Sequence, residues 1–68
     1  MYKIGDLLTH KDNYFYSDGY IRIGLFLVIQ VDQYDYRILC INNNQLPEMN
    51  GDIFHLPKIQ LENTMRVI

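Results

Sequence analysis

Two histidines and one cysteine, His10, Cys40 and His55, are the side chains of this chain best suited to bind a metal ion. Imidazole and thiolate are the ligands that zinc prefers. Three such residues at irregular spacing do not match a zinc finger or a zinc ribbon. We therefore predict that Cys40 is a small buried hydrophobic residue and that both histidines lie at strand edges. We expect no metal and no other cofactor.

Catalytic groups are equally sparse. Asp32 and Asp35 flank a polar turn, and two neighbouring carboxylates can hold a proton or a cation. Turn aspartates are common, however, because their side chains bond their own backbone. Ser17, the single serine, has no motif linking it to a base, and the chain has no glycine-rich phosphate loop. We expect a protein that is not an enzyme.

A loop rich in aromatic residues is more informative. Tyr14, Phe15, Tyr16 and Tyr20 bring four rings into one short polar segment. Tyrosines can stack on proline-rich peptides or on bases. Some of these rings are also needed to cap a core that lacks tryptophan. We predict that Tyr14, Tyr16 and Tyr20 contribute to partner binding.

Composition limits the kind of partner. The chain has 68 residues, eight acidic and six basic side chains, and a formal net charge of −2. This balance argues against sequence-independent binding of phosphates, and eight scattered carboxylates are too few for a DNA mimic. A length of 68 residues predicts one domain over 1–68. The lone cysteine and the absence of a signal peptide or a membrane-spanning apolar run favour a reducing cytoplasm.

The hydrophobic pattern has the period of β-structure, because β-branched and aromatic residues are frequent and alanine is absent. Pro57 can end a strand and open a helical turn. Short strands in close succession suit a small closed barrel. We predict an all-β fold with strands at 6–9, 21–31, 36–41, 51–56 and 64–68, and one 3-10 or helical turn at 58–61.

The hairpin formed by the second and third strands predicts the binding surface. On the third strand Arg37 should face water, which places Tyr36, Ile38 and Cys40 inward and leaves Leu39 and Ile41 on the opposite face.

On the second strand, the apolar residues at odd positions from 23 to 31 should share one face, and Phe26 and Val28 the other. A half-solvated sheet usually alternates polar residues on its outer face, so a hairpin that is apolar on both faces predicts a covered surface. The predicted partner-binding patch consists of Phe26, Val28, Leu39 and Ile41.

The order of these features resembles the small SH3-like barrel proteins of tailed phages. The resemblance rests on Gly5-Asp6-Leu7-Leu8, on Gly24 leading into Val28-Ile29-Gln30-Val31, and on the run from Tyr36 to Ile41. It implies a five-stranded SH3-like barrel. It also implies a viral protein, either a component of the virion or an accessory factor that docks on a host or defence protein in the host cytoplasm.

A second resemblance, to MazF/PemK ribonuclease toxins, rests on the early Gly5-Asp6 pair and on Arg22 before an apolar strand. The chain lacks the proline after that arginine, and no serine or threonine follows the strand where the catalytic hydroxyl of such toxins would lie. We therefore expect a protein–protein interaction module, with the chain itself as one possible partner. The alternatives are a nucleic-acid-binding barrel of the KOW or Tudor kind, which the charge disfavours, and a truncated ribonuclease of the toxin type.

Overall fold

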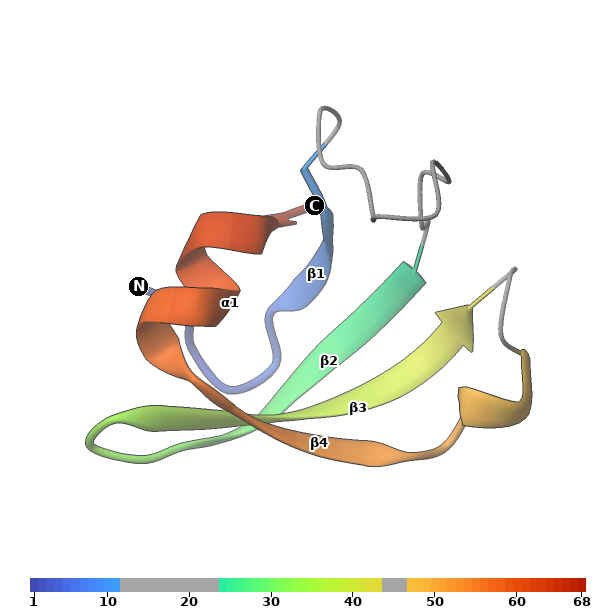
Figure 1. Ribbon diagram of the computed structural model, residues 1–68, viewed down its shortest axis with the longest axis horizontal. Helices are drawn as coiled ribbons and strands as arrows, with labels where there is room; N and C mark the ends of the chain where they lie inside the picture. The colour runs from blue at the N-terminus through green and yellow to red at the C-terminus, as the bar shows by residue number, and fades with distance from the viewer. Residues whose placement is uncertain (12–23, 44–46) are drawn as a thin grey trace.

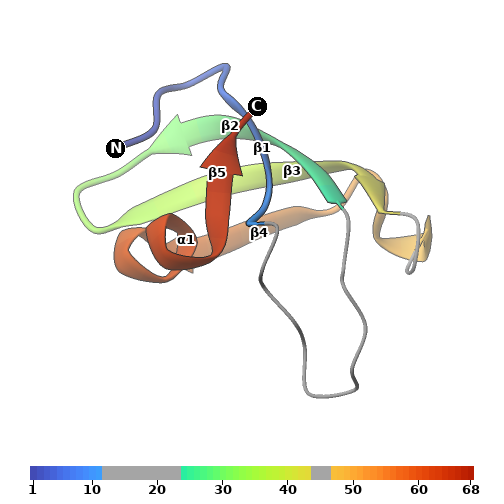
Figure 2. The same ribbon diagram turned by 90° about the horizontal axis from the view of Figure 1, so that it is seen from above.

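The computed structural model describes residues 1–11, 24–43 and 47–68. Five antiparallel strands form one sheet in the order β4-β3-β2-β1-β5 (Figure 1 and Figure 2). The elements are β1 (Leu7–His10), β2 (Gly24–Val31), β3 (Asp35–Asn43), the 3-10 helix η1 (Pro47–Met49), β4 (Ile53–Pro57), α1 (Lys58–Thr64) and β5 (Met65–Val67). The predicted succession of strands, with a helical segment before the last one, is confirmed, whereas η1 was not predicted.

Pro57 stands at the junction between β4 and α1. It is the last residue of β4 and the N-cap of the helix, with φ −58°. A proline fits there because its missing N–H would have no helical acceptor in the first turn. The helix runs to Thr64, beyond the predicted turn, and Met65 ends it by returning to extended backbone with φ −126°. Leu61 is its buried residue, so one apolar side chain anchors the helix to the core.

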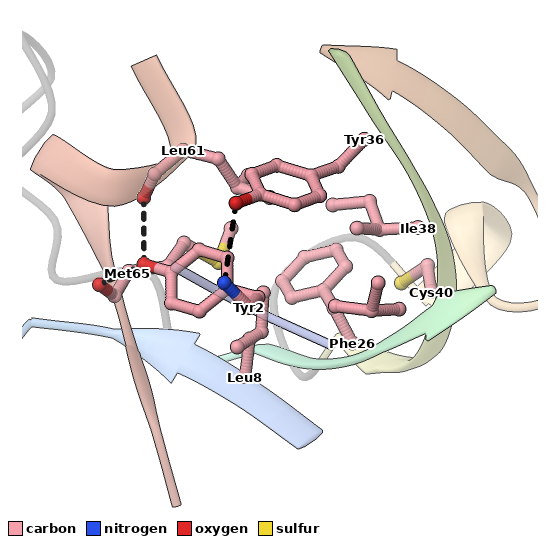
Figure 3. Close-up of a cluster of buried hydrophobic side chains, with 9 residues drawn as sticks. Tyr2, Leu8, Phe26, Tyr36, Ile38, Cys40, Leu61 and Met65 are labelled. Carbon is pink, nitrogen blue, oxygen red and sulfur yellow. Dashed lines mark hydrogen bonds between the residues drawn. The ribbon is translucent and has the colours of Figure 1, made fainter. Parts of the chain in front are cut away.

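The core lies between the inner face of the sheet and α1, as Figure 3 shows. Tyr36, Ile38 and Cys40 of β3 are fully buried, which confirms the predicted inward face of that strand. The remaining members come from the N-terminal segment, β1, β2, α1 and β5: Tyr2, Leu8, Phe26, Val28, Leu61 and Met65.

Tyr2 ties the N-terminal segment to this core. Its backbone N–H donates to the hydroxyl of Tyr36 at 3.1 Å, and its own hydroxyl lies 2.7 Å from the carbonyl oxygen of Met65 (Figure 3). The hydroxyl of Tyr36 donates in turn to Glu62 of α1 at 3.0 Å. Buried polar groups need such partners, and these bonds link the chain start, β3 and the helix.

The β2–β3 hairpin contains two register shifts, one at Ile29 and one at Ile41. Val31 lies opposite Tyr36 beside the turn, but Val28 lies opposite Ile38, so Ile29 is an extra residue in its strand. A bulge of this kind changes which face the following residues occupy. It places Val28, rather than Ile29, on the inner face.

The two edges of the sheet are β4 and β5, and α1 connects them in sequence. Figure 2 shows β5 beside β1 and α1 at the base of β5. Within 1–11, 24–43 and 47–68, no pairing joins β4 to β5. In the same ranges, α1 and η1 are both too short to cross a membrane.

Candidate docking surface

One row of apolar residues crosses four strands on the face of the sheet opposite the core. Leu7 lies opposite Leu27, Leu27 opposite Leu39, and Leu39 opposite Ile53. Residues directly opposite one another in an antiparallel sheet share a face. Leu39 lies between Ile38 and Cys40, which both point into the core, so this row lies on the outer face. We call these four residues, Leu7, Leu27, Leu39 and Ile53, the outer row.

Water reaches the outer row. Ile53 is 61% exposed and Leu7 39% exposed, while Leu27 and Leu39 between them are half-buried. Ile41, the bulged residue of β3, adds a side chain that is 40% exposed. An antiparallel sheet with one solvated face usually carries polar residues there, so a continuous apolar row across its strands is unusual and makes this face a candidate docking surface.

The predicted partner-binding patch is wrong for its two residues on β2. Phe26 and Val28 were expected beside Leu39 and Ile41, but they are 5% and 0% exposed and belong to the core. The physical reason is the bulge at Ile29, because regular pairing from the turn would have put odd-numbered residues inside.

Leu39 and Ile41 are accessible to solvent as predicted, and Leu27 replaces Phe26 and Val28 as the neighbour of Leu39. Tyr14, Tyr16 and Tyr20 lie outside the described residues.

A cluster of polar residues around two aspartates lies beyond one side of the outer row. His55 of β4 brings its Nε2 atom within 3.4 Å of an oxygen of Asp35 and 3.8 Å of one of Asp32. Gln30 donates a hydrogen bond to Asp32 at 2.8 Å. The two aspartates therefore do more than stabilise their own turn, because they join its tip to β4. The position of His55 beside these aspartates could not be predicted from the sequence, because it depends on the register between β3 and β4.

Arg37 lies between this cluster and the outer row. It pairs across the sheet with Gln30 on one side and His55 on the other, and it is exposed. Among the residues that the structure describes, no ion pair or hydrogen bond engages its side chain. The outer face thus offers an apolar row, an unengaged guanidinium and two carboxylates in sequence along the strands.

The structure does not bring the three candidate metal ligands together in one cluster. Cys40 is fully buried, and its Sγ lies 3.7 Å from Oδ1 of Asn50. Burial raises the pKa of this thiol, and the carboxylate of Asp52 adds to the effect. His10 packs edge-on against the Phe26 ring, with 5.8 Å between ring centroids, and His55 lies on the outer face. The described part of the chain has no cluster of three or more such side chains able to hold a metal ion.

Comparison with known proteins adds no relative. The sequence matches no protein-family model, and neither a curated protein nor a solved structure shows significant similarity to it.

Proposed function

We propose that this domain is a non-catalytic protein–protein interaction module that docks through the outer row. The observation that carries this proposal is the unbroken pairing of Leu7, Leu27, Leu39 and Ile53 across four strands on a solvated face. Fully burying an exposed Leu or Ile contributes about 1.5–3 kcal/mol, before the cost of association. Four neighbouring side chains, two of them half-buried already, are enough for a specific contact.

The SH3-like barrel and the phage setting form part of the same proposal. The pairing of the last strand with the first, and the helical segment between β4 and β5, are consistent with an SH3-like arrangement. The resemblance at Gly5-Asp6-Leu7-Leu8 and around Gly24 suggests a phage protein. We propose a small virion component or an accessory factor that docks on a host or defence protein in the host cytoplasm.

The test compares two surface variants of the same chain. The double variant Leu27→Lys, Leu39→Lys places charges at the centre of the outer row. The control Ile59→Lys places one on α1, where Ile59 is 73% exposed. Both variants should keep the β-type circular dichroism spectrum, because neither alters a core residue. Only the double variant should lose a binding partner that the wild-type protein retains on a column.

Two results would contradict the proposal. One is partner retention that is unchanged in the double variant. The other is binding of single-stranded RNA that weakens steeply with salt and ignores the outer row, since that behaviour identifies phosphate contacts.

A further inference from the structure

We infer that the partner of the outer row is a second copy of this chain, and that the two copies form a two-fold symmetric dimer with their sheets face to face. This inference rests on the proposed docking function of that row. It follows from the arrangement of the row and from the charges that border it.

The outer row can be superposed on itself by a two-fold rotation. An axis parallel to the strands, between β2 and β3, exchanges β2 with β3 and β1 with β4 in the two copies. Leu27 then packs over the second copy's Leu39, and Leu7 over the second copy's Ile53. Sheets that pack face to face lie about 10 Å apart, a spacing that two layers of Leu and Ile side chains fill.

The same axis gives Arg37 its missing partner. The rotation preserves position along the strands, so the charged ends of the two copies meet. Arg37 of β3 then lies over the second copy's β2 at Gln30, next to the turn that carries Asp32 and Asp35. A guanidinium on a flexible stem suits a carboxylate across an interface. Asp32 follows Gln30 on the same face of β2, so it is the carboxylate that Arg37 meets. Symmetry repeats the contact, so Arg37 of each copy faces Asp32 of the other.

The other in-plane axis does not produce this match. An axis along the outer row would lay Arg37 over the opposite side of the second copy's row, where β3 carries Ile41 and Asn42 rather than a carboxylate. The charges therefore select one of the two arrangements.

Size permits such a dimer. A standard interface covers roughly 800 Å² on each partner, and the whole accessible surface is 4513 Å². Less than a fifth of that surface is needed, which one face of a small domain can provide.

Sedimentation of charge-swapped variants tests the inference. Wild-type protein should sediment as a dimer. Arg37→Asp and Asp32→Lys should each raise the dimer dissociation constant at least about tenfold, because each brings like charges together where Arg37 of one copy faces Asp32 of the other. Mixing the two variants in equal amounts should restore the dimer, since both contacts are then complementary in the mixed pair. The control Glu48→Lys, on the exposed surface of η1, should leave the dimer unchanged.

The mixture makes the result independent of any loss of stability, because a damaged protein would not regain association from its counterpart. Wild-type protein that stays monomeric up to about 1 mM would overturn the dimer. If the wild-type monomer instead binds another protein, and the double variant Leu27→Lys, Leu39→Lys does not, the proposed docking function stands with that protein as the partner of the outer row. A dimer that persists in that double variant would contradict both the inference and the docking role of the row.

Discussion

Leu27 of β2 and Leu39 of β3 lie directly opposite each other on the outer face of the sheet, while their neighbours Phe26 and Cys40 oppose each other in the core. Adjacent residues of one strand therefore have opposite roles. Phe26 and Cys40 serve folding, whereas we propose that Leu27 and Leu39 serve association.

The opposite positions of Phe26 and Leu27 predict very different losses of stability when each is replaced by alanine. Phe26→Ala should lower the free energy of unfolding by about 3–5 kcal/mol, because it removes a buried ring and leaves a cavity. Leu27→Ala should cost less than half as much, since its side chain is only half-buried. Urea denaturation of both variants at a concentration where the protein is monomeric provides the measurement. Equal losses would show that Leu27 belongs to the core.

Alkaline pH should destabilise the fold, because the hydroxyl groups of Tyr2 and Tyr36 then lose their protons. Burial raises the pKa of both hydroxyls, and the Glu62 carboxylate raises them further. The unfolded chain then loses these protons first, so their contribution to stability is complete below the ordinary pKa near 10 and is lost as pH rises above it. The free energy of unfolding should therefore fall above about pH 10.

The variant Tyr36→Phe isolates this effect. It should lower the free energy of unfolding by about 1 kcal/mol at neutral pH, because it removes the hydrogen bonds to Tyr2 and Glu62. It should also make the alkaline loss shallower, because one of the two titrating groups is gone. Denaturation at several pH values, with ultraviolet absorbance to follow phenolate formation, checks both. If the free energy of unfolding of Tyr36→Phe fell as steeply above pH 10 as that of the wild type, Tyr36 would not be one of the groups responsible.

The thiol of Cys40 should be unreactive in the folded protein. Burial and the nearby Asp52 carboxylate raise its pKa, and the thiolate is the reactive form. Labelling with a disulfide reagent at neutral pH should be slow and should accelerate in denaturant to the rate of a free cysteine. Rapid stoichiometric labelling without denaturant would show that the thiol is accessible.

Gly24 should resist substitution by alanine. A Cβ atom at this position would lie 2.6 Å from Cε2 of the Phe26 ring, which is itself packed in the core. Gly24→Ala should therefore destabilise the fold by about 1–3 kcal/mol through overpacking. The double variant Gly24→Ala, Phe26→Leu should recover part of that loss relative to Phe26→Leu alone. A stability of Gly24→Ala equal to that of the wild type would contradict the close contact.

Much of the fold could be predicted because its signals are local. Arg37 breaks the apolar run of β3 and so reveals which of its neighbours face the core. Pro57 marks the end of β4 and the start of α1. The strand boundaries were displaced by one or two residues at several ends, since pairing partners decide where a strand stops.

The outer face of β2 could not be predicted because every residue from Ile23 to Ile29 except Gly24 is apolar. Neither face of such a strand is distinguished by polarity, and the hairpin register alone decides it. That register changes at Ile29 and again at Ile41 without a glycine or another local marker. The assignment of Phe26 and Val28 to the surface failed at this point, whereas Leu39 was placed correctly by its neighbour Ile38.

The most direct test of the outer row as the contact surface is an isotope-filtered nuclear Overhauser experiment on methyl groups. One half of the sample carries labelled methyl groups and the other half does not, so only contacts between copies are detected. We predict contacts from Leu27 to the second copy's Leu39 and from Leu7 to the second copy's Ile53, and none from the buried Val28. Intermolecular contacts confined to α1, or none from the outer row in a sample that sediments as a dimer, would contradict it.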